Sequence, residues 1–192
     1  MFTRRHALAL ISGGAMSVAT RPLMAANPTV ELGEDGLYHQ DWFLESFLEL
    51  ADDLNMASEN GKRFAVIWEL KGCPYCKETH FVNFAREDIS KFVKSNFDIL
   101  QLNIIGSRTV TDFDGEELSE KALAKKYGVR FTPTIQFFPE AMDGLAKAKP
   151  KTREVARAQG YLKPDHFLKM FQFVEGKSYK TMKFRQFLKT GS

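Results

Sequence analysis

The apolar and polar positions of the chain alternate between helical and strand periodicity. Apolar residues recur at helical spacing over residues 41–55, and a continuous apolar run with β-branched and aromatic residues follows at 64–68. A second strand-like run covers residues 97–104, after a breaker-free segment at 77–86 and a shorter one at 89–95. The first half of the chain is therefore predicted as helix, strand, two helices and strand.

The second half continues this alternation. Ser119 is a favourable N-cap for a helix that Gly128 ends after Tyr127. Four further segments are predicted as strand, strand, helix and short helix: residues 131–138, 154–160, 164–174 and 182–188. The full order, α-β-α-(α)-β-α-β-β-α-α, predicts an α/β fold in which a sheet is covered by helices on both faces.

Two segments without periodicity are predicted as loops. Residues 105–117 are polar and rich in turn residues, with Asp114-Gly115 as a tight turn, and they form an insertion before the third helix. We expect this insertion to be a solvated hairpin, with a lid that contacts a partner as the alternative. The lysine-rich segment 146–153, which includes Arg153, is also expected to be a solvated loop.

The first 26 residues differ in kind from the rest of the chain. Arg4-Arg5 precedes a modestly apolar run at residues 7–19, and Ala25-Ala26 supplies small residues for cleavage. We therefore expect residues 1–26 to be an export signal with features of the twin-arginine type, and the mature protein to be periplasmic. Residues 27–192 then form a single domain, in which 27–40 are an N-terminal arm.

The charge balance gives no support for binding to nucleic acid. The 27 lysines and arginines exceed the 24 aspartates and glutamates by three, and three of the arginines lie within residues 1–26. Without that segment, 24 basic residues face 24 acidic ones, so the formal excess of positive charge disappears. We expect the mature protein to act without nucleic acid and as a monomer.

The two cysteines, Cys73 and Cys76, are separated by two residues and come shortly after the first predicted strand. A Cys-x-x-Cys pair that opens a helix is typical of redox sites, although it can also form half of a metal site. Cys73 meets the free N–H groups and the positive end of the helix dipole, which stabilise a thiolate. We therefore assign Cys73 as the nucleophile and Cys76 as the thiol that resolves its mixed disulfide.

Three nearby residues are candidates for supporting this chemistry. Lys77 could stabilise the Cys73 thiolate. His80 lies four residues after Cys76 and therefore shares a helix face with it. Glu69 interrupts the apolar strand and could accept the proton of Cys76. We expect no metal and no cofactor beyond the Cys73–Cys76 disulfide, because a four-coordinate zinc would need two further ligands. A metal-handling dithiol remains the alternative from another functional class.

These residues resemble the thioredoxin superfamily in their order and setting. The resemblance covers about residues 41–175 and is carried by Trp68, Cys73-Pro74-Tyr75-Cys76, Tyr127-Gly128-Val129-Arg130-Phe131-Thr132-Pro133-Thr134 and Gly160. It implies a thioredoxin fold with a mixed central sheet, the insertion and an extra C-terminal helix. It also implies a cis peptide bond at Pro133 beside the cysteines. The substrate-binding residues that it implies are Thr132, Pro74, Tyr75 and Trp68.

One position departs from the thioredoxin pattern. Ile67 stands where thioredoxins usually bury an aspartate, six residues before the first cysteine. Proton transfer must therefore differ from that of thioredoxin, which makes Glu69 the candidate proton acceptor.

Within the superfamily, the chain is most similar to the periplasmic thioredoxins of sulfur-oxidation operons (SoxW type). The export signal, the motif around the cysteines, the insertion and the C-terminal helix carry this narrower resemblance. It implies a reductant of protein disulfides that receives electrons from a CcdA-like membrane protein and serves periplasmic sulfur-oxidation proteins. Pro74-Tyr75 is also the central pair of glutaredoxins, so a disulfide isomerase or oxidant of the same fold is the alternative.

Overall fold

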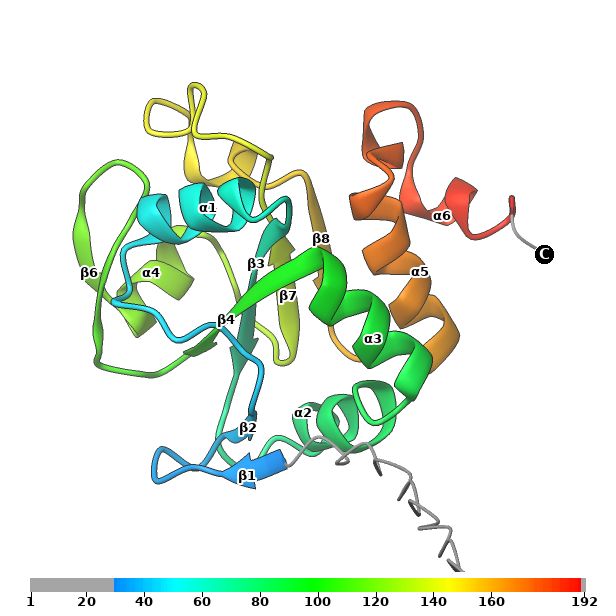
Figure 1. The fold of residues 1–192 in the computed structure, drawn as a ribbon. Helices are drawn as coiled ribbons and strands as arrows, with labels where there is room; N and C mark the ends of the chain where they lie inside the picture. The colour runs from blue at the N-terminus through cyan, green and yellow to red at the C-terminus, as the bar shows by residue number, and fades with distance from the viewer. Residues whose placement is uncertain (1–29, 191–192) are drawn as a thin grey trace, which may run out of the picture.

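The computed structural model describes residues 30–190, which form a four-stranded mixed sheet with helices on both faces (Figure 1). The strand order is β4-β3-β7-β8, with β3 parallel to β4, and β7 antiparallel to both β3 and β8. The bounds are β3 Arg63–Glu69, β4 Phe97–Asn103, β7 Thr134–Phe137 and β8 Ala156–Gln159. The predicted α/β class is confirmed, and the predicted export signal lies outside the described residues.

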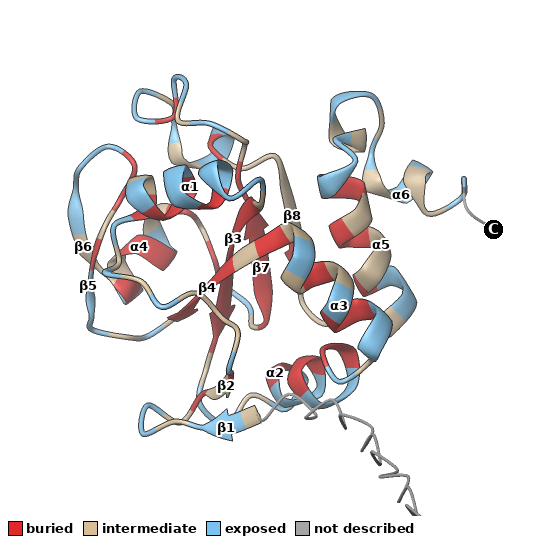
Figure 2. Ribbon diagram, in the orientation of Figure 1, coloured by how far each residue is buried: buried red, intermediate tan, exposed pale blue. Residues whose placement is uncertain are grey.

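Four helices cover the sheet. Helices α1 (Leu50–Glu59) and α4 (Glu120–Lys126) lie on one face, and α3 (Glu87–Asn96) and α5 (Pro164–Glu175) lie on the other (Figure 1). Strand β3 supplies both cores, because alternate side chains point to opposite faces. Phe64, Val66 and Trp68 join the α1–α4 core, whereas Ala65 and Ile67 join the α3–α5 core. Figure 2 shows β3 buried along its length, which explains its continuous apolar sequence.

The first helix begins at Leu50, later than the apolar spacing predicts. Residues 41–48 form an irregular segment in which Leu48 adopts a left-handed backbone (φ 67°) and Phe47 is 99% exposed. Trp42 and Phe43 pack against the α3–α5 core, whereas Leu44 and Leu48 pack against the α1–α4 core. The prediction of a helix from residue 41 is therefore wrong, because apolar residues that serve both faces of the sheet fell at helical spacing.

The N-terminal arm folds as a small hairpin. Strands β1 (Val30–Leu32) and β2 (Tyr38–Gln40) pair antiparallel and lie near α2 (Pro74–Glu78), at one end of the sheet (Figure 1). The arm is thereby part of the environment of the cysteines, and its last residue, Gln40, is buried there.

The insertion at residues 105–117 also folds as a hairpin, with β5 (Thr109–Thr111) and β6 (Glu117–Ser119). Asp112, in its turn, is buried and accepts hydrogen bonds from Arg153 (2.7 Å) and from the Tyr127 hydroxyl (2.6 Å). Arg153 follows the short helix η2 (Pro150–Thr152) and is only 3% exposed. The prediction of a solvated loop at 146–153 is therefore wrong for Arg153, which pairs with the insertion.

Arg153→Met should destabilise the protein by about 3 kcal/mol, because it leaves the buried Asp112 carboxylate without its guanidinium partner. Lys126 still forms an ion pair with that carboxylate and limits the loss. Urea unfolding followed by circular dichroism measures the effect, with Lys151→Met, an exposed lysine of the same loop, as the matched control. A loss no larger than that of the control would contradict a structural role for the Arg153–Asp112 pair.

Asp53, on α1, should make stability depend on pH. Burial raises the pKa of Asp53 from 3.8 to about 6, against the opposing hydrogen bond from the Ser46 hydroxyl (2.7 Å). Between these values the unfolded chain loses the proton that the folded chain keeps, so stability falls as pH rises through this window and stays reduced above it. Asp53→Asn should therefore raise the free energy of unfolding at pH 7.5, by up to about 3 kcal/mol.

The same substitution should have almost no effect near pH 3.5, where Asp53 is protonated in the folded chain and mostly protonated in the unfolded chain. Chemical denaturation of both proteins at the two pH values measures the difference. An equal gain at both pH values would contradict a buried carboxylate as its cause.

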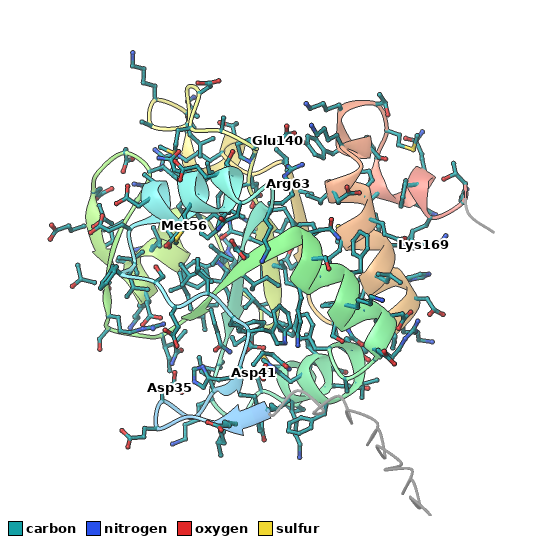
Figure 3. The ribbon with its side chains drawn as sticks, in the orientation of Figure 1. Asp35, Asp41, Met56, Arg63, Glu140 and Lys169 are labelled. Carbon is teal, nitrogen blue, oxygen red and sulfur yellow. A yellow bond between two sulfur atoms is a disulfide. The ribbon has the colours of Figure 1, made fainter. Side chains whose placement is uncertain are left out.

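The C-terminal segment folds back onto α5. Helices η3 (Ser178–Lys180) and α6 (Phe184–Phe187) follow it, and the rings of Phe184 and Phe187 lie 5.5 and 5.4 Å from that of Phe173. Arg63, at the start of β3, lies beside Glu140 and donates a hydrogen bond to a carbonyl of α5 (Figure 3). The predicted extra C-terminal helix is therefore present. No helix within residues 30–190 is long and apolar enough to cross a membrane.

Candidate active site

The two cysteines lie at the start of α2. Cys73 is its N-cap residue, and Pro74 occupies the first helical position, where its missing N–H costs no hydrogen bond. Cys73 and Cys76 form a disulfide with their Cα atoms 5.3 Å apart. Cys76 is 3% exposed, whereas Cys73 is half-buried, so Cys73 is the more accessible sulfur.

The Cys73 sulfur accepts two hydrogen bonds. The backbone N–H of Cys76 donates to Cys73 Sγ at 3.1 Å, and the Thr132 hydroxyl donates to the same atom at 3.4 Å. Donors that face a sulfur stabilise its thiolate more than its neutral thiol, because the charged form gains more from the hydrogen bond. The local geometry therefore favours negative charge on Cys73.

The Thr132–Pro133 peptide bond is cis, as the resemblance implied. This turn lies directly before β7, and the N–H of Gly160 donates to the Pro133 carbonyl at 2.8 Å. Pro133 is buried, while Thr132 is half-buried beside Cys73. The fold thereby brings two segments that are distant in sequence to the same sulfur.

An open groove of about 640 Å³ adjoins the Thr132 side of the disulfide. Its lining residues are Tyr75, Phe131, Thr132, Gln159, Gly160 and Tyr161. Tyr75 is 57% and Phe131 60% exposed, and the Tyr75 ring stacks on that of Tyr161 with centroids 5.9 Å apart. The groove offers aromatic surface next to a reactive sulfur, which suits an extended polypeptide.

A buried polar pair, Glu69 and His80, lies between the end of β3 and the helical segment that follows Cys76. The two residues are 1% and 0% exposed, and His80 Nε2 lies 2.9 and 3.1 Å from the two Glu69 oxygens. His80 belongs to a π-helical turn, η1 (Thr79–Asn83), that continues α2. Turns of this kind often occur at functional sites, and this one carries His80 inward.

Hydrogen bonds assign the tautomer of His80. The Trp42 indole N–H can only donate, and it meets Gln40 Oε1 at 3.2 Å, so the Gln40 amide directs its NH₂ group to His80 Nδ1 (3.1 Å). Nδ1 is therefore the acceptor, and Nε2 carries the hydrogen that it donates to Glu69. The orientation of the imidazole is thus set by two residues of the N-terminal segment.

Gln101, on β4, is the second donor to Glu69, and its amide also donates to the Tyr38 carbonyl at 2.8 Å. Glu69 thus accepts hydrogen bonds from the imidazole of His80 and the amide of Gln101. Among residues 30–190, no lysine or arginine forms an ion pair with this carboxylate.

A family model of the thioredoxin-like domain matches residues 50–175. The chain belongs to the thioredoxin-like family. With the Cys73–Cys76 disulfide at the start of α2, this thioredoxin-like protein is a thiol–disulfide oxidoreductase. A comparison with curated proteins found no match.

Comparison with solved structures supports the fold through a match with a TM-score above 0.5. A thioredoxin-fold protein from Helicobacter pylori is 20% identical, with a TM-score of 0.52, over 68% of this chain and 84% of that one. A thioredoxin from Thermus thermophilus also matches (22% identity, TM-score 0.47, 64% of this chain and 81% of that one). The oxidised C-terminal domain of DsbD from Neisseria meningitidis matches with 17% identity and a TM-score of 0.41, over 64% and 90% of the two chains. At these identities, the likeness concerns the fold alone.

The buried acid at the end of β3 is Glu69. Ile67 is fully buried in the α3–α5 core, and Glu69 follows it on the same face of β3, where the strand ends. A buried carboxylate is therefore present two residues later along the strand than the usual aspartate, and it is hydrogen-bonded to His80 in the turn that continues α2.

Trp68 does not lie on the substrate surface where the resemblance put it. Its side chain is 1% exposed in the α1–α4 core, and its indole N–H donates to Gln136 Oε1 at 2.6 Å. The physical reason is strand alternation, which turns Trp68 to the face opposite Ile67 and Glu69. Trp68 supports the sheet behind the site and contacts no solvent-facing groove.

Lys77 is exposed, and its ammonium group lies 5.9 Å from the centre of the Phe81 ring. This contact directs the side chain along the helix surface. Within residues 30–190, no three or more histidine, cysteine or acidic side chains form a cluster that could hold a metal ion.

Three site residues were missed from the sequence: Gln40, Gln101 and Tyr161. Gln101 carried a usable signal, since it is a polar residue inside an apolar strand and shares a strand face with Ile99. Gln40 and Tyr161 lie in segments without periodicity, and only the folded chain brings them to the site.

Proposed function

We propose that this thioredoxin-like protein reduces disulfides of partner proteins in the periplasm. The observation that carries the proposal is the asymmetry of the two sulfurs. Cys73 is half-buried and receives hydrogen bonds from the Cys76 N–H and the Thr132 hydroxyl, whereas Cys76 is buried. An accessible, stabilised thiolate suits attack on a partner, and a shielded thiol suits release of that partner.

The reaction has two exchange steps. The Cys73 thiolate attacks one sulfur of a partner disulfide, forms a mixed disulfide and releases the partner's other sulfur as a thiolate. Cys76 then loses its proton and attacks the Cys73 sulfur. This step forms the Cys73–Cys76 disulfide and releases the partner's second sulfur, so two electrons pass to the partner. During both steps, the Thr132 backbone next to Pro133 holds the partner segment, and Pro74 and Tyr75 contact it.

The Glu69–His80 pair takes up the proton that Cys76 loses. Glu69 ends the strand four residues before Cys73, and His80 lies four residues after Cys76 in the turn that continues α2, so the hydrogen bond between them joins the two segments that flank the cysteines. A carboxylate is an acceptor with lone pairs to spare beyond its bonds from His80 and Gln101. His80 fixes the carboxylate, and Gln40 fixes His80.

The resemblance to SoxW-type thioredoxins supports a more specific proposal. The protein receives its electrons from a CcdA-like membrane protein and delivers them to periplasmic proteins of sulfur oxidation. The export features of residues 1–26 support this location. Cell fractionation and mass spectrometry of the natural protein test it, with a mature N-terminus close to Ala26 as the expected result. A full-length protein in the cytoplasm would contradict it.

The reduction potential tests the direction of electron flow. After equilibration with glutathione or dithiothreitol buffers, we expect a value between about −270 mV, as in thioredoxin, and about −200 mV, as in glutaredoxins. A value near about −120 mV, as in strong periplasmic oxidants, would contradict a reductase and favour the oxidant alternative.

Metal analysis tests the metal-handling alternative. Zinc or copper that co-purifies stoichiometrically with the reduced protein, and is lost in Cys73→Ser, would favour that alternative.

A further inference from the structure

We infer that the partner segment docking at Cys73 is acidic, and that Arg130 and Lys151 select it. This inference rests on the proposed reduction of protein disulfides. The groove beside the disulfide continues into a second groove of about 580 Å³, and both are lined by Phe131 and Gln159. The second groove adds Arg130, Lys151 and Arg157 to the lining, so the continuous surface changes from aromatic to basic.

The charges in the second groove do not cancel. Arg157 pairs with Glu154 (2.9 Å) and donates to the Tyr127 carbonyl (2.8 Å), so its charge is already matched. Arg130 and Lys151 are exposed, and within residues 30–190 neither forms an ion pair with a carboxylate. Two cations therefore face the groove without an acidic partner, which is the condition for attracting an acidic ligand.

The residues that line the aromatic end of the groove are uncharged. Burial, followed by the negative charge of Glu78 on α2, raises the pKa of Tyr161 at this end. Among the residues that line the two grooves, the unpaired cations lie at the Arg130 end, so an acidic partner segment is attracted there. This difference predicts that the acidic residues of the partner lie on one side of its cysteine only.

The backbone distance from Arg130 to Thr132 predicts how far the partner's acidic residues stand from its cysteine. Arg130, Phe131 and Thr132 are consecutive, and the Thr132 hydroxyl contacts Cys73 Sγ, so Arg130 lies about 7 Å along the backbone from the reactive position. An extended partner covers this length in about two residues. The partner is thus a polypeptide with an apolar or aromatic residue beside its cysteine and acidic residues about two to five positions away, on one side only.

The test uses the reduced mature protein and peptides whose single cysteine forms a mixed disulfide with 2-mercaptoethanol. Four aspartates stand at positions two to five on the N-terminal side of the cysteine in one peptide and on the C-terminal side in another, and matched peptides carry lysine or asparagine there. We expect the second-order rate constant for single-turnover oxidation of the reduced protein by the peptide to be about tenfold higher with aspartate than with lysine for one of the two arrangements, and the ratio to fall as salt is added.

The double variant Arg130→Gln/Lys151→Gln should reduce this ratio to about twofold or less. The control variant Lys91→Gln/Lys189→Gln removes the same charge from exposed lysines on α3 and after α6, and should keep the ratio. A wild-type ratio near one in both arrangements, or a preference that survives in the double variant, would overturn the inference and leave the reductase function intact. Failure of the wild type to reduce any peptide would instead overturn the proposed function, and the inference with it.

Discussion

Cys76→Ser should accumulate mixed disulfides with partner proteins in the periplasm, whereas Cys73→Ser should trap almost none. The half-buried Cys73 still attacks in the first variant, but the hydroxyl that replaces the buried Cys76 cannot displace the partner. In the second variant, the remaining sulfur is 3% exposed and lacks the hydrogen bond from Thr132. We expect at least about tenfold more trapped protein with Cys76→Ser, in line with the dependence of exchange on access to the thiolate.

Acid quenching, alkylation and non-reducing electrophoresis measure the trapped fraction, and mass spectrometry identifies the partners. The double variant Cys73→Ser/Cys76→Ser is the control for association without a covalent bond. Equal trapping by the two single variants would refute the assigned roles. The identity of the trapped proteins also tests the connection to sulfur oxidation, because proteins of such a system should be enriched among them.

Glu69→Gln should slow release of the mixed disulfide by about 10²-fold at pH 7, the size of effect expected when a positioned proton acceptor is lost. The amide keeps the shape of the side chain and an oxygen for the His80 N–H, but it accepts no proton. The loss should shrink as pH rises towards 9, because solvent then deprotonates the Cys76 thiol without help. Stopped-flow measurement of the decay of a preformed mixed disulfide from pH 6 to 9 gives the profile.

Glu120→Gln is the matched control for this variant. Glu120 is equally buried and accepts hydrogen bonds from Arg108 and from the Asn103 N–H rather than from His80, so it tests the same chemical change without the same partner. It should lower stability and leave the pH profile of release unchanged. A profile of Glu69→Gln that is parallel to the wild type at all pH values would return Glu69 to a purely structural role. His80→Asn should reproduce part of the effect, since it removes the group that orients the carboxylate.

Much of the fold could be predicted because its strongest patterns are local. The apolar run of β3 is continuous because both faces of that strand are covered, and the N-cap at Ser119 accepts a hydrogen bond from the N–H of Ala122 (3.2 Å). The first helix was misplaced because Trp42 and Leu44 serve opposite faces of the sheet, a distinction that spacing alone does not contain. Arg153 was misassigned for a similar reason, since its partner Asp112 lies 41 residues earlier in the chain.

The reactive pair could be recognised without a structure, since two cysteines three positions apart at a helix start are adjacent through local geometry. The sequence also indicated that Glu69 faces the same way as Ile67, because strand alternation is local. The partners of the Glu69 carboxylate, in contrast, come from the packing of distant segments. His80, Gln101 and Gln40 come from a helix, a neighbouring strand and the N-terminal hairpin, and their bonds depend on how these elements pack. The same holds for Arg130 and Lys151, whose shared groove arises because separate loops meet at the edge of the sheet.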